Sequence, residues 1–128
     1  MKDIILWTVV FSISTAISIV LLGNRVLISG NLLTVKRIME LVFSWQFILA
    51  MTFALFSRFS FFLLNNAVLK VPELAQNSTT ITTFATAVSF IFVAAANYIF
   101  LQERLTLMQI LGASIIIFGL IVMLNGNK

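Results

Sequence analysis

The stretch "LAQNSTTITTFATAVSFIFVAAANYIFLQERLTLMQILGASIIIFGLIVML", residues 74–124, decides the fold of this chain. It contains two long runs without a charged side chain, which are separated only by Glu103 and Arg104, and the second run continues to residue 127. A helix needs about 20 apolar residues to cross the hydrocarbon of a bilayer, so each run is long enough for one span. The stretch therefore predicts two transmembrane helices joined by a tight turn.

The remainder of the chain has the same character. Of its 128 residues, 61% are hydrophobic and only 9% are charged, which is too little charge to cover the surface of a soluble domain. Further apolar runs extend the set of predicted spans to about residues 4–24, 38–64, 74–101 and 106–124. The runs are continuously apolar and lack the alternation of membrane barrel strands. We therefore predict an all-α integral membrane protein, with residues 1–128 forming a single transmembrane domain, a four-helix bundle.

Several classes of function are disfavoured by what the sequence lacks. It has no cysteine and no histidine, which excludes disulfides and thiolate metal sites and argues against zinc. It also has no Gly-rich phosphate loop, nucleophile elbow or paired-carboxylate motif, and no room for a soluble catalytic domain. We expect no enzymatic activity, no catalytic residue, no metal, no cofactor and no nucleic-acid partner.

Basic residues do not favour one orientation of the predicted spans, although Lys and Arg normally accumulate at cytoplasmic helix ends. The end that holds both termini carries Lys2, Lys70, Lys128 and, if its side chain snorkels to the nearer surface, Arg58; the other carries Arg25, Lys36, Arg37 and Arg104. Two interpretations stay open. Flanking residues set one fixed orientation, or the protein inserts both ways and pairs with an inverted copy or a sister subunit.

Arg58 is the only charge well inside an apolar run. An ionisable group at the centre of a span costs about 2.5 to 3.5 kcal/mol on insertion scales, so it normally has a partner or a function. One interpretation is that Arg58 snorkels passively to lipid phosphate. The other is that its bidentate fork receives an anionic substrate, because the interior offers Arg and hydroxyls and no mid-span carboxylate.

Polar side chains of the third predicted span share one helical face. Thr79, Thr83 and Thr86 fall at i, i+4 and i+7, and the same face reaches Asn97. In hydrocarbon these groups need partners, so the face lines a polar pathway, or each hydroxyl bonds back to its own helix. Three further residues complete the predicted substrate-binding set with Arg58: Ser14 and Ser18, which share a face of the first span, and Trp45 near one end of the second.

The last span places Gly112 and Gly119 seven residues apart, nearly on one face. Small residues let helix backbones approach closely in lipid. This face packs either against a partner subunit or against the alanines at 94–96 of the same chain.

The opening stretch also resembles the end of the repeat unit of the drug/metabolite transporter superfamily, which includes the EamA-like and small multidrug resistance proteins. The family pattern L-x-E-R-L-T-x-x-Q-x-x-G-x-x-L-I-x-x-G is matched at Leu101, Glu103, Arg104, Leu105, Thr106, Gln109, Gly112 and Gly119. Upstream, "NNAVLKVP" resembles the segment that precedes helix 3 of the same proteins. The resemblance covers residues 65–124, about half of the chain.

The resemblance implies a small multidrug resistance-like four-helix subunit that works as a homodimer or a heterodimer in the cell (inner) membrane. The first span lacks the membrane glutamate with which small multidrug exporters bind protons and cations, so the better match is to short flippase subunits that move lipid-linked sugars. The expected function is translocation of a polyprenyl-phosphate-linked sugar or related anionic lipid. The alternatives are a secondary exporter of small cations or metabolites that uses Glu40 or Glu73, and a non-transporting assembly subunit.

Overall fold

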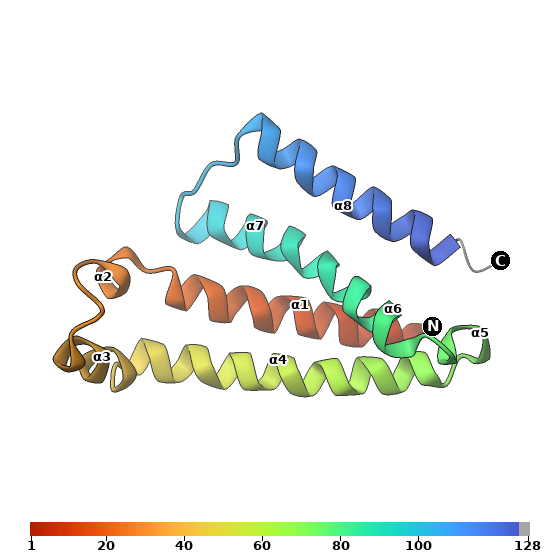
Figure 1. Ribbon diagram of the computed structural model, residues 1–128, viewed down its shortest axis with the longest axis horizontal. Helices are drawn as coiled ribbons and strands as arrows, with labels where there is room; N and C mark the ends of the chain where they lie inside the picture. The colour runs from red at the N-terminus through yellow and green to blue at the C-terminus, as the bar shows by residue number, and fades with distance from the viewer. Residues whose placement is uncertain (126–128) are drawn as a thin grey trace.

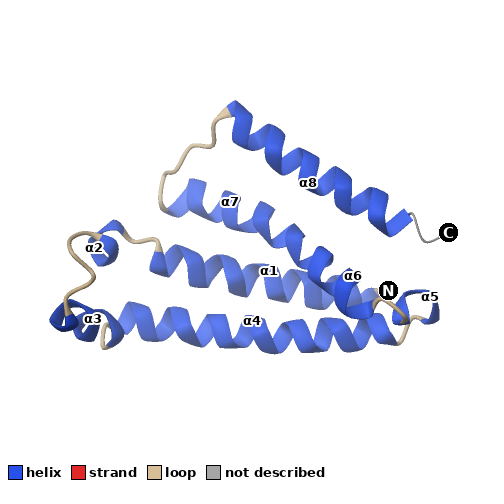
Figure 2. Cartoon of the chain, in the orientation of Figure 1, coloured by secondary structure: helices blue, strands red, loops and turns tan. Residues whose placement is uncertain are grey.

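The computed structural model describes residues 1–125, which form helices joined by short connections (Figures 1 and 2). In chain order the elements are α1 (Lys2–Leu22), α2 (Arg25–Ile28), α3 (Val35–Val42), α4 (Trp45–Leu69), α5 (Pro72–Ala75), α6 (Ser78–Ala85), the 3₁₀ turn η1 (Thr86–Val88), α7 (Ser89–Phe100) and α8 (Leu107–Asn125). No strand occurs in this part of the chain. The all-α prediction is confirmed for the described residues.

Three helices are long and apolar enough to cross a membrane: Lys2–Leu22, Trp45–Leu69 and the continuous unit Ser78–Phe100, which comprises α6, η1 and α7. The prediction of long apolar helices is confirmed for these three, and they are consistent with a membrane protein. The fourth predicted span corresponds to α8, of which Leu107–Gly119 is a shorter apolar helix.

The second span begins later than the predicted 38–64, because residues 35–42 form the separate helix α3. This helix carries its charges on one side, where Arg37 and Glu40 form an ion pair at 3.3 Å, and exposes apolar residues such as Val35 and Met39. A two-faced helix of this kind suits the membrane surface. A turn at Phe43 and Ser44 ends it, and the Ser44 hydroxyl caps α4 by accepting from the Phe47 N–H at 3.3 Å.

Helix α1 lies between α4 and α7 (Figure 1). Small buried residues line its contact with α4, including Ser14 and Ser18 from α1 and Ala50 and Ser57 from α4. The Ser18 hydroxyl donates to the Ala50 carbonyl at 2.9 Å, which is a direct hydrogen bond between the two helices. Small residues allow this close approach, and the bond satisfies a hydroxyl in an apolar setting.

Two ends of the bundle can be distinguished in Figure 1. The α2–α3 end contains the C-terminus of α1, the start of α4 and the loop between α7 and α8, whereas the N-terminus and α5 lie at the opposite end. Helix α8 lies beyond α7, and its main contacts are with η1 and α6. The described bundle is therefore tight around α1 and open around α8.

Candidate functional site

Arg58 lies near the middle of α4. The predicted span 38–64 had placed it closer to one end. It is one residue from the midpoint of Trp45–Leu69. At 1.5 Å per residue this places it about 20 Å from Trp45 and about 17 Å from Leu69 along the axis. Snorkelling of Arg58 to the membrane surface stays a prediction, and neither end of α4 is close to this residue.

The Arg58 side chain also faces away from the bundle. Its neighbours Ser57 and Ser60 are buried, whereas Arg58 is exposed on the outer face of α4. Among the described residues it takes part in no ion pair and no side-chain hydrogen bond. A mid-span guanidinium on the outside of the bundle has a group from another molecule as its available partner.

This position also changes the charge count for orientation. With Arg58 in mid-span, the α2–α3 end keeps Arg25, Lys36, Arg37 and Arg104, and the opposite end keeps Lys2 and Lys70. Lys128 lies outside the described residues. Counted from the sequence with Lys128, the α2–α3 end exceeds the opposite end by one basic residue, and this difference does not set an orientation.

The polar face predicted on the third span is divided by η1, with Thr79 and Thr83 before it and Asn97 after it. Thr79 and Thr83 are exposed and Thr86 is half-buried, and their hydroxyls are bonded locally: Thr83 donates to the Thr79 carbonyl at 2.8 Å and Thr86 to the Thr83 carbonyl at 2.5 Å. The face does not continue straight to Asn97. A 3₁₀ turn has three residues per turn, so η1 rotates the following helix by about 60° relative to a regular α-helix.

A neighbouring polar contact on α6 was not predicted. Thr82, which is fully buried, donates to Asn65 Oδ1 of α4 at 3.4 Å, and Asn65 Nδ2 donates to the Thr79 hydroxyl at 3.5 Å. This contact joins α4 to α6. Asn65 and Thr82 are 17 residues apart in the sequence, so no local pattern pairs them.

The other predicted site residues lie in separate places. Ser14 is buried and donates to the Val10 carbonyl at 2.8 Å, while Ser18 bonds across to α4. Trp45, the first residue of α4, is 70% exposed. Asn97 of α7 has a buried side-chain oxygen with no hydrogen-bond partner in the described part of the chain. The structure does not gather these residues and Arg58 around one cavity.

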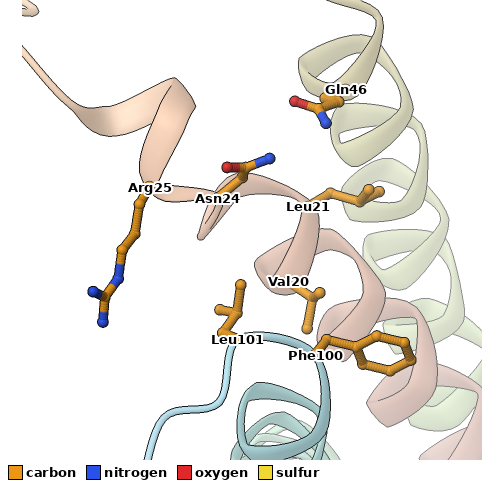
Figure 3. A pocket seen from close by; sticks show the side chains of 7 residues that line it. All are labelled: Val20, Leu21, Asn24, Arg25, Gln46, Phe100 and Leu101. Carbon is orange, nitrogen blue, oxygen red and sulfur yellow. The ribbon is translucent and has the colours of Figure 1, made fainter.

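A pocket of about 410 Å³ at the α2–α3 end brings together polar groups that sequence reasoning left unassigned (Figure 3). We call it the mouth pocket. It is lined by Val20, Leu21, Asn24, Arg25, Gln46, Phe100 and Leu101. The ends of α1 and α7 lie close together there, since a Cβ on Gly23 would lie 2.8 Å from Leu101 Cδ1. The loop "GNR" at residues 23–25 predicts a turn, and only the fold brings it beside Gln46 and Phe100.

The acidic residues proposed for cation export lie outside the apolar helices. Glu40 is paired with Arg37 on α3, and Glu73 is exposed on the short helix α5. Among the described residues no three carboxylates gather as they would to hold a metal ion.

The signature residues of the α7–α8 connection have a structural task. Thr106 N–H donates to Gln109 Oε1 at 2.8 Å and Gln109 N–H donates to the Thr106 hydroxyl at 3.4 Å. This reciprocal pair is a capping box, which satisfies the free N–H groups at the start of α8. Gln102 has a positive φ of 54°, and the Asn97 carbonyl accepts from the N–H groups of Leu101 and Glu103 where α7 ends.

Comparisons with protein-family models, with curated proteins and with solved structures find no match.

Proposed function

We propose that this chain is a subunit of a membrane transporter that moves an anionic lipid, in particular a polyprenyl-phosphate-linked sugar, across the cell membrane. The observation that carries the proposal is Arg58, a charged side chain at the middle of α4, exposed on its outer face and unpartnered within the described residues. A charge in this position is costly unless it meets a complementary group.

A phosphate from a lipid is well suited to meet it. The guanidinium presents five N–H donors in a planar fork that matches two phosphate oxygens. No carboxylate lies inside α4, because Glu40 belongs to α3 and Glu73 to α5. An arginine on an outer face without a competing acid receives an anion from the lipid phase more readily than a cation.

The proposal includes α8 as a fourth span and a second subunit. Gly112 and Gly119 of α8 have nothing within 4 Å of the position where a Cβ would stand. Ala94 of α7 and Ala113 of α8 line a groove of about 250 Å³ between these helices. An open surface of small residues is suited to close packing against a helix of another subunit in lipid. Two subunits would also enclose more of a head-group path than one.

A reconstituted translocation assay tests the function. The purified protein is placed in vesicles that contain a fluorescent polyprenyl phosphoglycoside, and a membrane-impermeant quencher bleaches only the outer leaflet. Wild-type protein is expected to bring the inner-leaflet probe out to the quencher, whereas Arg58→Ala is expected to abolish this. Phe62→Leu changes an exposed neighbour on α4 and is the matched control.

Two controls make the outcome specific. Fluorescent phosphatidylcholine carries a phosphate masked by a choline cation, so it is expected to cross more slowly than the anionic probe. Cross-linking confirms that Arg58→Ala still assembles. Equal translocation by wild type and Arg58→Ala contradicts the role of Arg58, and no translocation by the wild type of either lipid contradicts the function.

A further inference from the structure

The mouth pocket continues into a second depression between α1 and α7. This depression, which we call the α1–α7 groove, has a volume of about 460 Å³. The two cavities share three wall residues, Val20, Leu21 and Phe100. One continuous surface therefore runs from the end of the bundle down the side of two apolar helices.

The upper part of this surface is rich in hydrogen-bond donors. Asn24 Oδ1 is occupied, since it accepts from the Val26 N–H at 3.0 Å, and this leaves the Asn24 amide Nδ2 to donate. Figure 3 shows the carboxamides of Asn24 and Gln46 on one side of the pocket, whereas the Arg25 side chain lines another side and its guanidinium points away from them. No carboxylate lines the pocket, and in the described part of the chain no acid pairs with Arg25.

The lower part is apolar throughout. The groove is lined only by aliphatic and aromatic side chains and by alanines, with Ala16 on α1 and Ala96 on α7. These two small side chains leave space between larger neighbours such as Ile17 and Phe92. The combined volumes fall in the range of small-molecule sites, and the polar groups are confined to one end.

We propose that the mouth pocket and the α1–α7 groove form a binding site for one anionic lipid. Its phosphate group is held by Asn24 and Gln46 and by Arg25, whose long side chain turns toward them when the lipid binds, and one of its hydrocarbon chains lies in the groove. The charge complementarity of the mouth and the order of the surface, donors at the helix ends and apolar walls below, match a lipid with its head at the membrane surface. This site excludes Arg58, and it binds lipid whether or not the chain translocates it.

Free phosphate and a helix from a second copy of the chain fit this surface less well than a lipid does. Free phosphate would use only the mouth and gain nothing from the groove. An apolar helix from a second copy would fill the groove and leave the Arg25 charge without a partner at the mouth. A lipid uses both parts, because the charge-assisted hydrogen bonds select its head and the groove accepts its chain.

Native mass spectrometry of the full-length protein in detergent tests the site. The protein is mixed with equal amounts of phosphatidylglycerol and phosphatidylcholine, and the lipid retained on the protein is counted. Wild type is expected to retain phosphatidylglycerol preferentially. Arg25→Gln is expected to lower that preference about tenfold or more, since a hydrogen bond to a charged group typically accounts for that factor. Ala96→Trp fills the groove and is expected to remove retention of both lipids.

Matched variants separate the site from general effects. Arg104→Gln removes a charge at the same end of the bundle, and Ala95→Trp enlarges the adjacent alanine of α7, which does not line the groove. Both are expected to bind as the wild type does. Helix content is measured by circular dichroism for every variant, and Ala96→Leu replaces Ala96→Trp if the larger side chain unfolds the protein.

Three results would overturn the proposal. Unchanged preference in Arg25→Gln removes the mouth pocket from lipid selection. Displacement of phosphatidylglycerol by inorganic phosphate at similar concentration shows that the groove contributes nothing. Loss of dimer in Ala96→Trp with lipid retention intact makes the groove an interface between copies. Arg58→Ala should retain phosphatidylglycerol normally, so a failed translocation assay and a failed lipid site are told apart.

Discussion

Replacing Arg58 with leucine is expected to improve insertion of α4 and to abolish translocation. The two effects have opposite signs because the arginine is unfavourable in the membrane, whereas the proposed function needs it to bind the substrate. A residue whose role is structural would lose stability and function together. The Arg58→Leu variant therefore separates a functional charge from a structural one.

The size of the insertion effect follows from the position of Arg58. It lies one residue from the midpoint of α4, so the values for a helix centre apply. Arginine there costs about 2.5 to 3.5 kcal/mol, and leucine contributes about −0.3 to −0.6 kcal/mol. The substitution should favour insertion by about 3 to 4 kcal/mol, which is roughly 100- to 1,000-fold in the insertion equilibrium.

Insertion is measured in the full chain with glycosylation tags in the connections on either side of α4, so that a missed span changes the glycosylation pattern. Arg58→Lys keeps the charge and loses the planar fork, so it should insert as the wild type does but translocate poorly. Phe62→Leu should leave both measurements unchanged. Equal insertion of wild type and Arg58→Leu would refute the mid-span position, and normal translocation by Arg58→Leu would refute the functional charge.

Three further predictions concern the helices that support the site. Thr106→Ala and Gln109→Ala should each destabilise the start of α8 by about 1 kcal/mol, which is measured as faster amide hydrogen exchange. The double variant should lose little more, because the two bonds of the capping box are reciprocal. Fully additive losses would contradict the capping box. Ser18→Val should lower the free energy of unfolding by about 1 to 2 kcal/mol, because it removes the hydrogen bond to the Ala50 carbonyl. Thr83→Val, at an exposed position, should change the free energy of unfolding little. Equal losses in the two variants would refute a special role for the bond between α1 and α4. Gly112→Leu should leave helix content unchanged because nothing lies within 4 Å of the position of its Cβ, yet it should weaken the proposed dimer in analytical ultracentrifugation. Unaltered self-association would contradict an interface at this face.

Uncharged apolar runs located the three long apolar helices because membrane insertion is decided by local composition. The run after Ile4 and the uncharged residues 74–102 were sufficient for that purpose. These runs did not predict the boundary before Trp45. There the amphipathic helix α3 is followed directly by α4, and apolar residues occur in both helices. The cap at Ser44 separates them, and the serine at that position was a readable signal.

The candidate site was less accessible to sequence reasoning. Thr79, Thr83 and Thr86 were grouped by α-helical spacing, but η1 changes the rotation from Thr86 onward. The buried contact is made instead by Thr82 with Asn65. The mouth pocket depends on Asn24 of the α1–α2 connection, Gln46 of α4 and Phe100 of α7, which share no motif. Arg58 was identified from the sequence because a charge within an apolar run is visible, while its outward direction needed the packing of α1 against α4.

The contact between Arg58 and a lipid phosphate can be measured directly by solid-state nuclear magnetic resonance. The protein, with ¹³C-labelled arginine, is placed in phosphate-free glycolipid bilayers, so that added polyprenyl phosphate is the only source of ³¹P. Dephasing of the guanidinium carbon by ³¹P is compared between wild type and Arg58→Lys. We predict a dephasing component that appears with polyprenyl phosphate and is absent from Arg58→Lys. Identical dephasing in the two proteins would contradict the claim that Arg58 receives the phosphate.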